Sequence, residues 1–237
     1  MDSKQVVSPF AHKHPSALKL AQVKDWVFDL DNTIYPAASS LFPRVARRMT
    51  EWIMQEFSMN EHDAATLKTR LFREYGTTMR GLMEEYNMPS DAFLAYVHEI
   101  DLSDVSYDVV LDRTLAALPG RKHIYTNGTV RHAERILEAF GIRQHFDFIF
   151  DIVAADHVPK PAPAPYDLFI SCSGIEPSQA VMIEDMARNL EPAAALGMQT
   201  VWLASDEAWA QEGADEAYVQ FVAKDVKELL ICLTETE

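Results

Sequence analysis

The chain has 237 residues, 48% of them hydrophobic, which is enough to bury the core of one large domain or of a domain with a modest insertion. Its 36 acidic and 21 basic residues give a net charge of −15, which argues against a nucleic-acid polymer as partner. Two cysteines are too few for a disulfide framework and no apolar stretch matches a signal peptide or a membrane span, so we expect a cytoplasmic protein without a membrane partner.

The first 22 residues are mixed in polarity and predict an N-terminal lead-in, residues 1–22, that is extended or poorly ordered. His12 and His14 have a spacing sometimes seen in metal sites. No cysteine lies near them, so we expect two solvated side chains and assign them no function.

Two aspartates follow the first apolar run of the chain. The run Trp26–Phe28 is short, aromatic and β-branched and predicts a buried strand, and Asp29 and Asp31 lie directly after it. Ligands of open α/β sheets bind at this edge, and residues at i and i+2 point to the same side. The two carboxylates could therefore converge, and a divalent metal would relieve the repulsion between them.

Four helices and no strand are predicted over the next seventy residues, because apolar side chains recur at spacings of three and four. We expect the first helix to start at Pro43, the second to be capped by Asn60, the third to open at Thr77 or Thr78, and the fourth to be capped by Ser90. Such a block could form a small helical bundle inserted after the first strand.

Helices and strands alternate from about residue 108 onward, which predicts an α/β fold with a doubly wound parallel sheet. The expected strands cover residues 122–125, 148–150, 180–183 and 200–203, and the expected helices cover 108–118, 130–140, a segment after Pro165 and a segment closed by Gly197. The core is therefore split in sequence, with residues 23–36 joining residues 108–237.

Polar residues follow three of the later apolar segments as well. Thr126 and Asn127 offer a hydroxyl and an amide that suit a bound oxyanion. Lys160 lies between two prolines, which would hold one ammonium group at little entropic cost so that it offsets phosphate charge. Glu184 and Asp185 place further carboxylates at a strand end and could complete a Mg²⁺ site.

Each pattern alone also has an ordinary structural explanation. Asp-x-Asp and Thr-Asn-Gly often form turns, a loop lysine is usually solvated, and Glu184 with Asp185 could simply cap a helix near Met186. The order of the patterns, and their common position after apolar strands, make the combination specific. We therefore interpret them together as one site for phosphate chemistry.

The four segments resemble the signature motifs of the haloacid dehalogenase-like hydrolase superfamily. They are Asp29–Thr33, Thr126–Asn127, Lys160 and Glu184–Asp185. The resemblance implies a Rossmann-like catalytic core with an all-helical cap over residues 37–107, between the first and second motifs. The segments Asp29–Pro36 and Tyr75–Leu82 look like those of the pyrimidine 5′-nucleotidase branch.

The resemblance also implies a role for each motif residue. Asp29 would be the nucleophile that forms an aspartyl-phosphate, and Asp31 would be the general acid and then the general base. Mg²⁺ would be held by Asp29, the backbone carbonyl of Asp31, and Asp185, and the phosphate would be bound by Thr126, Asn127 and Lys160. Asn189 stands where many relatives have a second acid, and it could orient water or Lys160, with Glu184 in a similar supporting position.

The cap would close over the site, exclude water and contact the leaving group. The candidates for its lining are Tyr35, Tyr75, Thr77, Thr78 and Arg80. Aromatic residues at helical spacing more often pack in a core, and an arginine on a short helix is more often solvated.

The expected activity is Mg²⁺-dependent hydrolysis of a small phosphorylated metabolite, with a pyrimidine nucleoside 5′-monophosphate as the leading substrate, by a monomer or homodimer. Alternatives are a phosphatase for a sugar phosphate or phosphoglycolate, a phosphomutase, and a non-catalytic protein that binds a phosphorylated metabolite. Dehalogenation is disfavoured because that chemistry has no leaving alkoxide for Asp31 to protonate.

Overall fold

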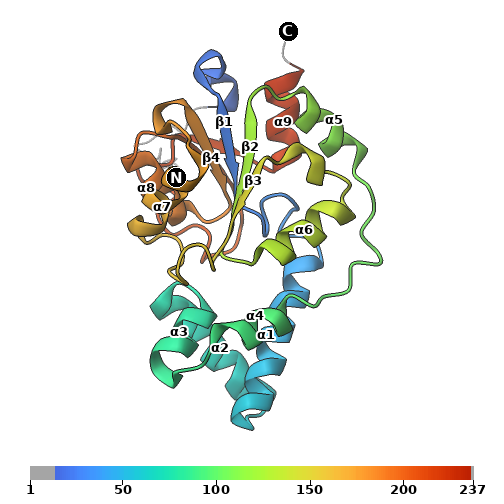
Figure 1. The fold of residues 1–237 in the computed structure, drawn as a ribbon, viewed down its shortest axis with the longest axis vertical. Helices are drawn as coiled ribbons and strands as arrows, with labels where there is room; N and C mark the ends of the chain where they lie inside the picture. Colours follow the sequence, from blue (N-terminus) through green and yellow to red (C-terminus); the bar gives the residue numbers. More distant parts are fainter. Residues whose placement is uncertain (1–13, 236–237) are drawn as a thin grey trace, which may run out of the picture.

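A six-stranded parallel sheet lies at the centre of the computed structural model, which describes residues 14–235 (Figure 1). The strands are β1 (Asp25–Phe28), β2 (Arg121–Tyr125), β3 (Phe148–Phe150), β4 (Ala180–Glu184), β5 (Gln199–Leu203) and β6 (Phe221–Ala223). Their order is β3-β2-β1-β4-β5-β6, so the direction of winding reverses between β1 and β4. Ligand sites of open α/β sheets form at such a reversal.

Nine helices of the described chain surround this sheet. Four follow β1: α1 (Leu41–Phe57), α2 (Glu61–Tyr75), α3 (Thr78–Tyr86) and α4 (Ser90–Val97). The others are α5 (Val109–Ala117), α6 (Val130–Ala139), α7 (Pro163–Ser173), α8 (Leu190–Ala195) and α9 (Val226–Thr234). In Figure 1, α5, α6 and α9 lie on one side of the sheet, α7 and α8 lie on the other, and α1–α4 lie beyond the edge where the strands end. The predicted α/β class, with a doubly wound sheet and inserted helices, is confirmed.

Both faces of the sheet are covered, and this explains the uninterrupted apolar run of β1. Trp26 and Phe28 pack into the core that contains α5, α6 and α9, whereas Val27 packs into the core that contains α7 and α8. All three side chains are fully buried. A strand buried on both faces needs an apolar residue at every position, which is typical of parallel sheets.

The inserted helices begin close to the predicted residues, and the first of them needs a correction. Asn60 and Thr77 cap α2 and α3 as expected, each accepting a hydrogen bond from a backbone N–H of the first turn. However, α1 begins at Leu41 instead of Pro43, because Leu41 is buried in the core and a proline fits anywhere in a first turn.

Two further helix starts also differ from the expectation. Pro89 is the N-cap of α4, and the side chain of Ser90, which was the predicted cap, instead forms a hydrogen bond of 2.9 Å with His157 Nε2. The helix expected after Pro165 starts at Pro163, because both prolines fit in its first turn.

The predicted lead-in falls largely outside the described residues, including His12. Its described part, residues 14–22, forms two short 3₁₀ turns, Pro15–Ala17 and Leu20–Gln22, where an extended or poorly ordered chain was expected. Leu18 between them is buried in the core, which accounts for the ordered path.

No helix within residues 14–235 combines the length and apolar character needed to cross a membrane.

The turn before β2 fixes how β2 pairs with β1. Gly120 has a φ of +92°, and a Cβ atom at this position would lie 2.5 Å from the backbone oxygen of Lys24. The N–H of Arg121 donates to the same oxygen at 2.9 Å. In the resulting register Phe28 is paired with Ile124, so the polar residues that follow the two strands lie side by side.

We expect Gly120→Ala to lower the free energy of unfolding by roughly 2–3 kcal/mol, because both the positive φ and the contact with Lys24 oppose a side chain. Gly174→Ala is the matched control: Gly174 has a φ of +65° and no atom within 4 Å of the added Cβ, so its loss should be about 1 kcal/mol. Urea denaturation of the three proteins measures the difference. Equal losses in the two variants would contradict the role assigned to the close contact.

Candidate active site

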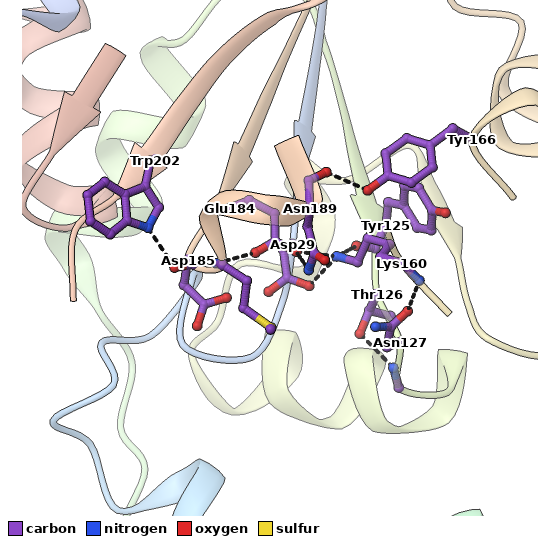
Figure 2. A network of polar contacts seen from close by, with 12 residues as sticks. Asp29, Tyr125, Thr126, Asn127, Lys160, Tyr166, Glu184, Asp185, Asn189 and Trp202 are labelled. Atoms are coloured by element: carbon purple, nitrogen blue, oxygen red, sulfur yellow. Dashed lines mark hydrogen bonds and ion pairs between the residues drawn. The ribbon is translucent and has the colours of Figure 1, made fainter. Parts of the chain in front are cut away.

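The ammonium group of Lys160 lies where the polar segments meet (Figure 2). Lys160 Nζ donates hydrogen bonds to Asp29 Oδ1 at 2.7 Å, to Glu184 Oε1 at 2.9 Å and to the backbone oxygen of Tyr125 at 2.9 Å. These partners come from the ends of β1, β4 and β2. One buried side chain therefore joins three neighbouring strands.

Lys160 keeps its positive charge although it is only 2% exposed. Burial alone would lower the pKa of its ammonium group, but Asp29 and Glu184 outweigh burial and raise that pKa above its ordinary value. The backbone N–H of Lys160 also donates to Asn127 Oδ1 at 3.0 Å, which ties the loop to the end of β2. The result is a fixed cation beside two carboxylates.

Glu184 is held by three donors. Its Oε1 accepts from Lys160 Nζ and from Asn189 Nδ2 at 2.6 Å, and its Oε2 accepts from the N–H of Met186 at 2.7 Å. Burial would raise the pKa of Glu184, but Lys160 and these hydrogen bonds lower it, so the carboxylate stays ionised. Asn189 is thus linked to Lys160 through Glu184.

Three buried carboxyl groups offer ligand atoms for a cation. Oxygens of Asp29, Glu184 and Asp185 lie within 4.8 Å of one another. Burial raises the pKa values of Asp29 and Asp185, and the charge of Glu184 adds to that effect. Carboxylate oxygens are the ligands that hard divalent cations prefer, so this group fits Mg²⁺.

The contacts of the three acids differ, and this indicates how they would share a cation. Glu184 already has three hydrogen-bond donors, whereas Asp29 has one and the Asp185 carboxyl group is paired with Glu184 itself. Asp185 is positioned by its backbone oxygen, which accepts from Trp202 Nε1 at 2.8 Å. Asp29 and Asp185 are therefore the side chains best placed to bind Mg²⁺. Participation of the Asp31 carbonyl remains a prediction.

Asp31 lies in a separate hydrogen-bonded group. Its Oδ1 accepts from the hydroxyl of Tyr35 and from His132 Nε2, the latter at 3.0 Å. Burial would raise the pKa of Asp31, but His132 and Tyr35 outweigh burial and hold the pKa below its ordinary value. The two aspartates of the first motif therefore have different partners.

Two histidines at this site were absent from the prediction. His132 lies in the first turn of α6, and the ring of His98 stacks on it with centroids 4.3 Å apart. Burial, together with the charge of His132, lowers the pKa of His98 to about 3, so the His98 ring is neutral. The sequence contained one clue to His132: this residue lies in the predicted helix that directly follows Thr126 and Asn127.

The predicted phosphate-binding residues lie at the end of β2. Thr126 is buried, and its hydroxyl oxygen accepts from the N–H of Gly128 at 2.9 Å. Asn127 Oδ1 accepts from the backbone of Lys160, which leaves the Asn127 amide protons for another acceptor. The structure thus brings Thr126, Asn127 and Lys160 to one edge, and their role in binding phosphate remains a proposal.

The predicted cap residues fall into two groups. Tyr75 and Arg80 line a cleft of about 470 Å³ together with the Lys160 loop. Thr77 instead caps α3, and Thr78 is buried with its hydroxyl donating to a backbone oxygen of α2. Tyr35 contacts Asp31 rather than the cleft. The cleft also contains Arg73 and Arg188, which the sequence motifs did not indicate.

Comparison with known proteins gives a family and several partial relatives. The model of a family described as haloacid dehalogenase-like hydrolase matches residues 26–197. Phosphate metabolism protein 8 of Saccharomyces cerevisiae is 26% identical over 193 residues, which is 74% of this chain and 60% of that protein. Fructose-1-phosphate phosphatase YqaB of Escherichia coli is 42% identical over 72 residues, 29% of this chain and 36% of that protein. The chain thus matches less than two thirds of either relative.

A solved structure agrees with the fold. The HAD phosphatase from Thermococcus onnurineus has a TM-score of 0.60 and 17% sequence identity, over 89% of this chain and 98% of that chain. At this identity the likeness concerns the fold alone.

We expect Mg²⁺ to raise the melting temperature, because it offsets the mutual repulsion of Asp29, Glu184 and Asp185. At 100 times its Kd, a ligand adds about 2.7 kcal/mol, which corresponds to roughly 5–10 °C for a chain of this size. The rise should be larger at pH 8 than at pH 5.5. The raised pKa values of Asp29 and Asp185 mean that protons compete with the cation at low pH.

Thermal unfolding with MgCl₂, against choline chloride at equal ionic strength, measures this effect. Asp185→Asn should abolish most of the rise and should raise the melting temperature of the metal-free protein, because one buried like charge is removed. An unchanged Mg²⁺ effect in Asp185→Asn would place the cation elsewhere.

Proposed function

The chain belongs to the haloacid dehalogenase-like hydrolase family, and we propose that it is a Mg²⁺-dependent phosphatase acting on a small phosphorylated metabolite. The observation that carries this proposal is the 2.7 Å contact between Lys160 Nζ and Asp29 Oδ1 beside the carboxyl cluster. The charge of a fixed ammonium group can offset the negative charge on the oxygens of a phosphoryl group while the adjacent carboxylate attacks the phosphorus.

The first half of the proposed reaction transfers the phosphoryl group to Asp29. Its carboxylate oxygen bonds to phosphorus as the bond from phosphorus to the ester oxygen breaks. Asp31, which takes up a proton when the anionic ester binds beside it, gives that proton to the departing oxygen. Thr126 and Asn127 hold the phosphoryl oxygens during transfer, and Lys160, whose three protons are already bonded, offsets their negative charge. Mg²⁺ bound by Asp29 and Asp185 would supply positive charge that allows an anionic ester to approach this acidic site.

The second half releases phosphate. Asp31, now ionised, takes a proton from a water molecule whose oxygen attacks the phosphorus, and the bond to Asp29 breaks. Inorganic phosphate leaves, Asp29 regains its carboxylate and Asp31 its proton. We assign residues 37–107 as a cap that excludes bulk water during these steps, with Tyr75 and Arg80 facing the cleft beside Lys160.

Within this class we propose a nucleoside 5′-monophosphate, with pyrimidine nucleotides first, as the substrate. The support is the resemblance of the segments Asp29–Pro36 and Tyr75–Leu82 to the pyrimidine 5′-nucleotidase branch. In the structure these segments supply Tyr35, beside Asp31, and Tyr75 and Arg80, in the cleft. A sugar phosphate is the rival substrate, because the E. coli relative is named as a fructose-1-phosphate phosphatase.

We expect Asp29→Asn to reduce phosphate release by roughly 1,000-fold or more, because the amide is a poor nucleophile. The same substitution at Asp25 is the matched control, since Asp25 is also buried on β1 but bonds to His123 at the opposite end of the strand. Release of inorganic phosphate from p-nitrophenyl phosphate with Mg²⁺ measures activity, and circular dichroism checks the fold. Activity close to wild type in a folded Asp29→Asn protein would remove the covalent step.

A substrate panel should identify the metabolite. We expect the highest kcat/KM for UMP or CMP, compared with AMP, fructose 1-phosphate, other sugar phosphates and phosphoglycolate. A clear preference for a non-nucleotide would overturn the nucleotide proposal while leaving the phosphatase proposal intact. A phosphomutase would instead pass the phosphoryl group to a second substrate with little free phosphate, and a binding protein would release none.

A further inference from the structure

We propose that Tyr35 and His132 hold the carboxyl group of Asp31 so that its Oδ2 atom is the one that gives and takes the catalytic proton. His132 and Tyr35 are then positioning residues, which act on the ester through Asp31. This inference rests on the proposed function, because it concerns the general acid and base of the same reaction.

The hydrogen bonds to Asp31 are all on one oxygen. The hydroxyl of Tyr35 and the Nε2 atom of His132 both contact Oδ1, and no described residue donates to Oδ2. The side chain of Asp31 is 19% exposed, so the carboxyl group is not sealed off from the space beside it. An oxygen that accepts two hydrogen bonds is a poor place for an added proton, whereas the other oxygen of the same carboxyl group is free to bind one.

Tyr35 is suited to act as one permanent donor. A tyrosine hydroxyl has an ordinary pKa of about 10, so it keeps its proton at neutral pH. The side chain is almost fully buried, and its ring stacks on Phe140 with an angle of 17° between the ring planes. The hydroxyl is therefore fixed in direction as well as in position.

The imidazole of His132 is fixed from two sides. Thr129, the N-cap of α6, accepts from the backbone N–H of His132 at 3.2 Å, and its hydroxyl contacts His98 Nδ1 at 3.1 Å. The ring of His98 stacks on that of His132 with an angle of 15° between the planes. A Cβ atom on Gly128 would lie 3.3 Å from His132 Cδ2, so the glycine leaves room for the ring.

A fixed Asp31 matters most when the leaving group needs a proton. An alkoxide is a poor leaving group, so hydrolysis of an alkyl phosphate depends on the proton from Asp31. The p-nitrophenolate ion is stable in water and leaves without help. Loss of the proper orientation of Asp31 should therefore slow alkyl esters far more than p-nitrophenyl phosphate, because general acid catalysis contributes about 10²–10⁴-fold. A merely structural role would slow both substrates by the same factor.

The chain contains a matched control for a buried histidine bonded to an aspartate. His123 Nε2 contacts Asp25 Oδ1 at 2.9 Å, and both residues are buried at the end of the sheet away from Lys160. His123→Ala should therefore lower stability without changing the ratio of rates for the two kinds of ester.

The experiment compares kcat/KM for p-nitrophenyl phosphate and for the best alkyl phosphate of the panel. We expect His132→Ala to lower the alkyl rate by about 100-fold and the p-nitrophenyl rate by less than about 5-fold. His132→Gln should restore most of the loss, because its amide Nε2 can donate in place of the ring nitrogen. Tyr35→Phe removes the hydroxyl but keeps the ring, and it should also lower the alkyl rate more than the p-nitrophenyl rate. This second variant allows the test to be completed if His132→Ala does not fold.

The outcomes separate this inference from the function on which it rests. Equal losses for both esters in the folded variants would overturn the positioning role while the phosphatase proposal stands. Wild-type protein that hydrolyses neither ester with Mg²⁺ would overturn the proposed function itself. A shift of the ratio in His123→Ala equal to that in the His132 variant would also refute a specific role for His132.

Discussion

The buried ammonium group of Lys160 is the interaction on which the site depends. It contacts the ends of three neighbouring strands and lies against two carboxylates in a chain whose net charge is −15. Removing one partner of a buried ion pair typically costs about 3–5 kcal/mol, because the other charge is left without compensation. The charge of this cation, which lies between Pro159 and Pro161, therefore offsets part of the cost of burying Asp29 and Glu184.

The same short motif gives two acids with different properties because their surroundings differ. Asp29 lies among other carboxyl groups, and burial raises its pKa despite the nearby ammonium group. Asp31 faces His132 and Tyr35, whose hydrogen bonds lower its pKa in spite of burial. Environments that shift two carboxyl groups in opposite directions are a common way to divide their roles in catalysis. In the site without metal and ester these shifts run opposite to the proposed roles, because a nucleophile must be ionised and a proton donor protonated. Bound Mg²⁺ would lower the pKa of Asp29 and an anionic ester would raise that of Asp31, so the proposed roles belong to the loaded site.

Much of the architecture was predictable because local patterns and packing agree. The apolar runs of β1, β2 and β4 and the polar residues after them were identified from the sequence, as were the caps Asn60 and Thr77. The short strand β6 and the final helix α9 were not predicted. A strand of three residues carries little periodicity, and β6, unlike β3, is not made of three large apolar residues. His98 and His132 were not predicted either: their contact joins positions 34 residues apart, and neither belongs to a strand-end motif. Pairings of this kind follow from the tertiary fold and not from local spacing.

The position of β1 has a consequence for the order in which the protein assembles. Residues 25–28 form a central strand, yet their partners begin at Arg121 on one side and at Ala180 on the other. During synthesis β1 remains unpaired, with its apolar side chains uncovered, while the helices that follow it emerge from the ribosome. Helices depend on local contacts and form early, whereas pairing between distant segments is slow. The inserted helices can therefore fold before the preceding strand β1 pairs with β2 and β4, and the carboxylate of Asp29, our proposed nucleophile, is among the last groups to reach its final surroundings.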